Sequence, residues 1–182
     1  MAKLLTAGPE ITATFGLRVR MLLYIVRHGL AGQHGDPRYP DDALRPLTEK
    51  GQKQFRRVVK KLSRRGFAPE RVATSPLVRC RQTAELICER LSPSPELVEL
   101  AALQPGSQLD ALIAWSNLQG VDELGWVGHA PDVEALVGEL IGAGGEALVL
   151  AKGAVAAIAF DDLIEPSQGQ LRWLATPAML GC

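Results

Sequence analysis

Short apolar runs alternate along the chain with segments in which apolar residues recur at helical spacing. Residues 22–26 form an uninterrupted apolar run that leads into an Arg-His-Gly sequence at 27–29. Residues 124–127 form a further short apolar run, and residues 71–74 have Val72 and Ala73 at their centre; both segments lead into junctions that contain proline. Short apolar runs with such boundaries indicate buried strands. We therefore predict a strand at each of these three places.

One helix is predicted before the second strand and another after it. Thr48 is a candidate N-cap, and residues 49–65 carry an apolar stripe with the spacing i, i+3, i+4 and i+7. That stripe consists of Phe55, Val58, Val59 and Leu62. Ser75 is predicted to cap the next helix, with Pro76 at its first helical position. The stripe of this second helix consists of Cys80, Ala84, Ile87, Cys88 and Leu91. Core packing is therefore the role expected for both cysteines.

The second half of the chain continues the alternation. Residues 97–100 predict a short strand, one helix is expected to begin near Ser107, and another follows Pro131. Residues 154–160 and 171–174 predict two closing strands. Strands that alternate with helices favour an α/β fold with a mostly parallel central sheet, here a three-layer α/β/α sandwich.

The composition is that of a globular protein with a substantial core. With 182 residues, 47% hydrophobic and 22% charged, residues 21–182 are expected to form one domain. Residues 1–20 are expected to form an N-terminal extension that is either disordered or adds a strand at residues 11–19. Twenty basic residues balance twenty acidic ones, which argues against nucleic acid as a partner.

Cysteine content and hydropathy indicate the cellular compartment. Three cysteines without CxxC spacing argue against a disulfide framework and against a zinc site. No apolar run approaches the roughly 18 residues of a membrane span. The first twenty residues also lack the continuous apolar segment of a signal peptide. We therefore expect a cytoplasmic protein with no membrane partner and no bound cofactor.

Each of the three strand-to-helix junctions carries residues suited to chemistry. Arg27 and His28 end the first strand, Arg79 lies in the first turn of the helix after the second strand, and His129 follows the third. If these strands are parallel neighbours, the junctions open on the same edge of the sheet, where α/β proteins bind ligands. Two of the three histidines of the chain would then share a pocket with two arginines.

A phosphoryl group suits such a cluster. Arginines make strong, charge-assisted bonds to its oxygens, and an imidazole can divide the transfer into two steps by acting as the nucleophile. Gly29 would allow a ligand to approach the backbone closely. Metal binding is the alternative interpretation, but two histidines flanked by arginines rather than carboxylates make a poor cation site.

Two features remain open between a structural and a functional interpretation. His34 lies in an irregular loop beside the expected pocket, as either an exposed loop residue or a functional one. The helix predicted at 49–65 carries many lysines and arginines. They are either a solvated helix surface or a basic flank that steers an acidic or phosphorylated protein towards the pocket.

These motifs resemble those of the histidine phosphatase superfamily. The matching segments follow one another in the expected order at residues 27–29, 47–51, 75–83 and 128–129. Within the superfamily, the sequence is similar to the short SixA-type phosphohistidine phosphatases. The resemblance implies a phosphoglycerate mutase-like fold.

The resemblance also implies roles for the residues of the junctions. His28 would be the nucleophile, forming a phosphohistidine that water then hydrolyses. Arg27, Arg79 and His129 would hold the phosphoryl oxygens, with no metal required. Gly29 would belong to the substrate-binding part of the same site.

Two departures from the superfamily pattern bear on the substrate. Many members use a carboxylic acid to protonate the leaving oxygen. Glu99 is the only candidate on position, and a surface role is the alternative for it. SixA-type members generally lack this acid, which a phosphorus–nitrogen bond tolerates because imidazole is expelled more easily than an alkoxide. The chain also has no sizeable insertion between Arg79 and His129 to form a substrate lid. That argues against phosphoglycerate mutase and for an open site.

We therefore expect a phosphatase that acts through a covalent phosphohistidine intermediate. Its expected substrate is phosphohistidine on a signalling or phosphotransfer protein. One alternative is hydrolysis of a small sugar or nucleotide phosphate by the same chemistry. Another is a non-catalytic module that binds phosphoproteins.

Overall fold

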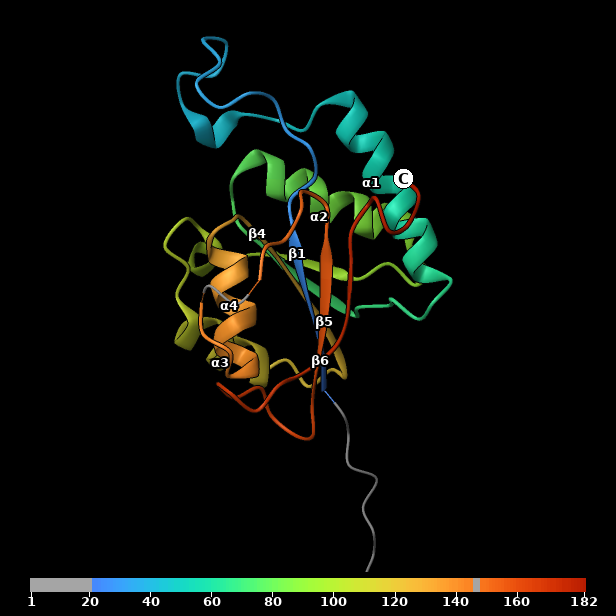
Figure 1. Ribbon diagram of the computed structural model, residues 1–182, viewed down its shortest axis with the longest axis vertical. Coiled ribbons are helices and arrows are strands. Elements are labelled where there is room, and N and C mark those ends of the chain that lie inside the picture. The colour runs from blue at the N-terminus through green and yellow to red at the C-terminus, as the bar shows by residue number, and fades with distance from the viewer. Residues whose placement is uncertain (1–20, 146–147) are drawn as a thin grey trace, which may run out of the picture.

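The computed structural model describes residues 21–145 and 148–182, which are built around one mixed sheet (Figure 1). Its strands are β1 (Met21–Arg27), β2 (Arg71–Thr74), β3 (Glu96–Glu99), β4 (Glu123–Gly128), β5 (Val155–Phe160) and β6 (Gln170–Ala175). Their spatial order is β3-β2-β4-β1-β5-β6. The first four strands in this order are parallel, whereas β5 is antiparallel to both β1 and β6. The predicted α/β fold with a mostly parallel sheet is confirmed. The predicted N-terminal extension lies outside the described residues.

Helices cover both faces of the sheet (Figure 1). One face carries α1 (Glu49–Ser63) and α2 (Val78–Arg90), and the other carries α3 (Leu109–Asn117) and α4 (Asp132–Ile141). The 3₁₀ helices η1 (Asp42–Leu44) and η2 (Ala101–Leu103) lie in the connections. None of the helices in the described ranges is long and apolar enough to cross a bilayer.

Strand β1 shows why the layers form. Successive side chains of a strand point to opposite faces of the sheet. Leu23 and Ile25 accordingly pack in the core under α3 and α4, and Tyr24 and Val26 in the core under α1 and α2. All four side chains are fully buried. The run is apolar at every position because both faces of this strand are covered.

Helix α1 forms as its sequence predicts. Thr48 is the N-cap, and its Oγ1 accepts a hydrogen bond from Gly51 N at 2.9 Å. The predicted apolar stripe is buried in the core. Gly51 faces the segment that follows the first strand, since a Cβ at this position would lie 2.0 Å from Leu30 O. The absence of a side chain at Gly51 therefore lets α1 pack directly against the chain that leaves β1.

Helix α2 begins later than predicted. We expected Ser75 as the N-cap and Pro76 as the first helical residue, but the helix starts at Val78 and Leu77 occupies the N-cap without a side-chain bond. The Ser75 hydroxyl accepts a long hydrogen bond from Leu77 N at 3.5 Å, just ahead of the helix, and lies 2.8 Å from the Nε2 atom of a histidine in the third junction. The predicted stripe is also only partly buried, because Cys88 and Leu91 are half-exposed.

Candidate active site

Strand register brings the three junctions to one edge of the sheet. Arg27 at the end of β1 pairs with Gly128 at the end of β4, and Val127 of β4 pairs with Thr74 at the end of β2. The backbone pairing continues one residue further, because His28 N donates to Gly128 O at 3.0 Å. The residues after these strand ends are therefore held at a common edge.

A cavity of about 610 Å³ opens at this edge, and the four residues singled out from the sequence all line it. These are Arg27, His28, Arg79 and His129. The two imidazole rings meet edge to face, with their centroids 5.7 Å apart. Residues more than 100 positions apart in the sequence thus share one pocket.

His28 is held as a neutral, oriented imidazole. Its ring is buried, and Nδ1 lies 2.7 Å from Gly29 O. Because a carbonyl oxygen only accepts hydrogen bonds, Nδ1 carries the proton and Nε2 keeps its lone pair. The pKa of His28 is lowered to about 3, mainly by burial and also by the positive charge of Arg79, while the hydrogen bond to Gly29 O opposes the shift. At neutral pH the ring therefore presents an unprotonated nitrogen, which is the form a nucleophile requires.

Gly29 is part of the scaffold behind this ring. Its N–H donates to Thr83 Oγ1 at 3.1 Å, and the Thr83 hydroxyl in turn donates to Arg79 O at 2.7 Å. The turn after β1 is thereby tied to the first turns of α2. This connection fixes the segment that carries His28 relative to the helix that carries Arg79.

Arg27 supplies one positive charge from the floor of the pocket. Its guanidinium donates to Leu150 O and lies 3.7 Å from the Glu134 carboxylate. Glu134 also accepts a hydrogen bond from Leu150 N at 2.9 Å, so these three groups hold one another in place. The Nε atom of Arg27 is buried without a hydrogen-bond partner among the described residues. The guanidinium therefore retains capacity for an anion.

Arg79 supplies the second charge from the first turn of α2. Its guanidinium donates to Asp42 O at 2.8 Å and lies 3.1 Å from the Asp42 carboxylate. Burial lowers the pKa of Arg79, although Asp42 opposes that shift. Its Nε, like that of Arg27, has no partner in the described part of the chain. A bound anion would compensate the charge of both guanidinium groups, of which Arg79 is buried and Arg27 half-buried.

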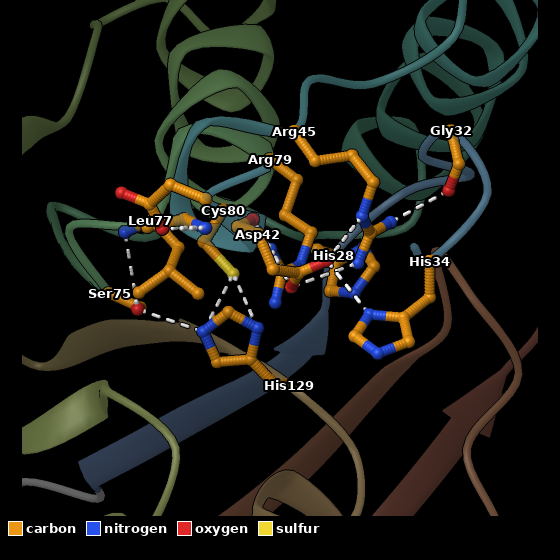
Figure 2. Close-up of polar contacts among 12 residues, drawn as sticks. His28, Gly32, His34, Asp42, Arg45, Ser75, Leu77, Arg79, Cys80 and His129 are labelled. Carbon is orange, nitrogen blue, oxygen red and sulfur yellow. Dashed lines mark hydrogen bonds and ion pairs between the residues drawn. The ribbon is translucent and has the colours of Figure 1, made fainter. Parts of the chain in front are cut away.

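His129 closes the pocket opposite His28 (Figure 2). Its Nε2 lies 2.8 Å from Ser75 Oγ, and Cys80 Sγ lies 3.5 and 3.6 Å from the two ring nitrogens. The Cys80 thiol also lies 3.4 Å from Gly128 O, and burial raises its pKa to about 12. Burial lowers the pKa of His129 to about 4. The imidazole is therefore neutral, and it is oriented by a hydroxyl and packed against a protonated thiol.

Asp42 and Arg45 complete the pocket, and the sequence analysis did not identify either as a site residue. The Asp42 carboxylate accepts from Arg45 Nε at 2.7 Å and contacts His34 Nδ1 at 2.9 Å (Figure 2). These partners hold the pKa of Asp42 well below its usual range, with the Arg45 hydrogen bond as the main cause. Arg45 is further fixed by donation to Gly32 O at 2.7 Å. His34 is exposed, but it stands at the rim of the cavity.

Glu99 is not brought into this pocket. It is the last residue of the edge strand β3, its carboxylate lies 3.7 Å from Arg81, and it is absent from the residues that line the cavity. Within the described ranges, no group of three or more His, Cys, Asp or Glu side chains is placed to hold a metal ion. The pocket is instead dominated by arginines and neutral imidazoles, which suit a tetrahedral oxyanion.

A mostly parallel sheet with this pocket at its carboxyl edge defines an α/β protein built to bind a phosphoryl group. The family model of the histidine phosphatase superfamily (branch 1) matches residues 23–104, from β1 through η2. The chain belongs to the histidine phosphatase superfamily and is a phosphatase with a phosphoglycerate mutase-like fold. The resemblance inferred from the sequence motifs is thereby confirmed.

Individual relatives cover most of the chain. Phosphohistidine phosphatase SixA from Escherichia coli is 29% identical over 163 residues, which cover 88% of this chain and 96% of SixA. The solved structure of the protein histidine phosphatase SixA complexed with tungstate superposes with a TM-score of 0.77. It is 27% identical, over 88% of this chain and 99% of that one. An uncharacterized protein from Picosynechococcus is 38% identical over 117 residues, 62% of this chain and 68% of its own length.

Proposed function

We propose that this phosphatase hydrolyses phosphohistidine on a protein, through a covalent intermediate on His28. The observation that carries the proposal is the state of His28. A neutral ring with a free Nε2 faces a pocket whose other walls are cationic. The similarity to SixA, a phosphohistidine phosphatase by name, supports the same substrate class.

In the first step, Nε2 of His28 attacks the phosphorus atom of the substrate. A bond forms between Nε2 and phosphorus while the bond from phosphorus to the leaving atom breaks, and its electron pair departs with the leaving group. The proton on Nδ1 remains hydrogen-bonded to Gly29 O, where it stabilises the positive charge that develops on the ring. No proton has to leave His28 before it attacks.

Arg27, Arg79 and His129 act on the phosphoryl oxygens during both steps. The arginines balance the negative charge on these oxygens, and their fixed partners hold them in position before the substrate arrives. In the second step, water attacks the phosphorus atom, the bond to Nε2 breaks, and inorganic phosphate leaves. The electron pair of the broken bond returns to Nε2, so His28 is neutral again and keeps its proton on Nδ1. The proton lost by the attacking water passes to the phosphate or to solvent.

The pocket has no acid able to donate a proton among its described lining residues, and this favours phosphohistidine over an alkyl ester as the substrate. Asp42 is the only carboxylate among the described residues that line the pocket, and its low pKa keeps it ionised, so it has no proton to donate. Glu99 lies outside the lining. An alkoxide leaving group needs an acid, whereas a protonatable imidazole leaves more easily. The pocket therefore suits a phosphorus–nitrogen bond.

A comparison of substrates tests this proposal. We expect kcat/KM for a phosphohistidine peptide to exceed that for sugar and nucleotide monophosphates by about 100-fold or more, since general-acid catalysis contributes roughly 10²–10⁴-fold where it operates. Glu99→Gln serves as the control and should change neither value. Equal turnover of a small ester, or a selective loss of ester turnover in Glu99→Gln, would show that an acid operates and that the substrate class is wrong.

A further inference from the structure

The positive charge of this chain is concentrated on one helix. Residues 49–65 carry eight of the twenty Lys and Arg residues but one of the twenty Asp and Glu residues. The overall charge is balanced, so the remainder of the chain is acid-rich. The exposed cations of α1, together with the residue that follows the helix, form what we call the basic face. They are Lys50, Lys53, Arg57, Lys60 and Arg64. At 3.6 residues per turn they lie opposite the buried stripe.

Few acidic side chains lie close enough to the basic face to neutralise its positive charge. In the parts of the chain that the structure describes, the ion pair made by α1 is that of Arg56 with Glu89, at 3.2 Å, and Arg56 lies beside the basic face. Arg57 donates to a backbone carbonyl, Gly181 O, at 3.0 Å, which leaves its charge unpaired. Positive charge on this face is therefore free to act on a partner.

The amino-terminal end of α1 lies next to the pocket. Thr48 N donates to Leu30 O at 2.9 Å, and Gly51 packs against the same carbonyl, two residues after His28. Lys152 lines the cavity itself, and Gly153 N donates to His28 O at 3.0 Å. Cations are therefore present both in the first turns of α1 and in the lining of the cavity.

The pocket has few side chains that could recognise the part of the substrate to which the phosphoryl group is attached. Its lining in the described residues contains no aromatic side chain apart from histidine and only small apolar ones, such as Ala31 and Ala130. Ligand pockets that recognise small molecules are mostly apolar and aromatic, with few polar groups. Recognition of the rest of the substrate must therefore come from the surface around the pocket.

The chemistry of this surface favours an acidic protein over other anions. The apolar stripe of α1 is buried in the core, so the helix has no apolar face to insert into a bilayer. The basic face carries no aromatic residue on which nucleic-acid bases could stack. Charge complementarity with an acidic protein surface needs neither feature.

We propose that the basic face of α1 docks the acidic surface of the phosphorylated protein and guides its phosphohistidine into the pocket. The proposal rests on the proposed function and names the partner of the same site. Lys50 and Lys53 lie nearest the pocket and contact the partner, while the cations further along the helix attract it from a distance.

Two synthetic phosphohistidine peptides test the docking. One carries Asp and Glu around the phosphohistidine, and the other carries Asn and Gln at the same positions. At low ionic strength we expect kcat/KM to be about tenfold higher for the acidic peptide, an effect of the size that electrostatic steering produces. We expect kcat to be nearly equal for the two peptides, and the difference in kcat/KM to shrink as salt is added. The double variant Lys50→Glu/Lys53→Glu should abolish the advantage.

The control is the double variant Arg90→Glu/Arg172→Glu, which makes the same charge change on exposed positions away from the pocket and should keep the preference. No preference in the wild type, a preference that survives Lys50→Glu/Lys53→Glu, or its equal loss in the control would each overturn the docking proposal. So would stronger inhibition by a single-stranded oligonucleotide or an anionic vesicle than by unphosphorylated acidic peptide. Turnover of the neutral phosphohistidine peptide by the wild type reports the proposed function separately.

Discussion

At the scale of single residues, the site depends on two histidines whose burial keeps them neutral. The pKa of His28 falls to about 3 and that of His129 to about 4, in both cases mainly because burial disfavours the charged ring. Both rings are nearly inaccessible to water, with 6% and 4% of the residue exposed. The same desolvation that keeps Nε2 of His28 unprotonated has a cost in stability at low pH.

The sign of that cost follows from the pKa values. Both folded-state values lie below the unfolded value of 6.5, so the unfolded chain takes up these protons first as the pH falls. We expect each histidine to remove about 2 kcal/mol of unfolding free energy between pH 7 and pH 5. Denaturant unfolding of the wild type and of His28→Gln/His129→Gln measures this. The variant should show the shallower pH dependence, and parallel curves would refute the assignment of neutral buried rings.

At the scale of elements, α1 fixes the segment that carries His28, the proposed nucleophile. Its N-cap residue Thr48 bonds to Leu30, and its first turn packs against the same backbone at Gly51. Leu30 follows His28 and Gly29 directly, so a shift of α1 would move His28. The helix thus couples a packing contact to the geometry of the active site.

Gly51→Ala tests this coupling. The added methyl group would lie 2.0 Å from Leu30 O, so the helix or the segment after β1 must move. We expect a loss of about 1–3 kcal/mol in unfolding free energy, the usual range for overpacking. We also expect kcat to fall in the fraction of enzyme that remains folded. Lys53→Ala, at an exposed position of the same helix, is the control for stability and should change it little; unaltered kcat in Gly51→Ala would separate α1 from the nucleophile.

At the scale of the whole molecule, the sequence predicted the elements that repeat a simple pattern. The apolar run before Arg27, the helical stripe around Phe55 and the strand before His129 were placed correctly, because burial dictates their periodicity. The parallel neighbours β1, β4 and β2 then brought Arg27, His28, Arg79 and His129 together.

Contacts between distant segments were beyond the sequence patterns. Asp42 lies in a loop without periodicity, and its bonds to Arg45 and Arg79 depend on how that loop folds over the pocket. Ser75 has the residue type and position of an N-cap, but its hydroxyl bonds to His129, 54 positions away. Sequence patterns predict the roles of such polar residues from their neighbours along the chain, whereas their contacts in the site are with residues distant in the sequence.

The central claim is that His28 carries the phosphoryl group during turnover, and isolating that intermediate tests it most directly. The enzyme is mixed with an aryl phosphate labelled on phosphorus, quenched rapidly in base, and digested to find the labelled residue. We predict an acid-labile label on His28 that forms and decays at the rate of turnover and is absent from His28→Ala. Label on His129 or on any other residue, or label that persists in His28→Ala, would contradict the account.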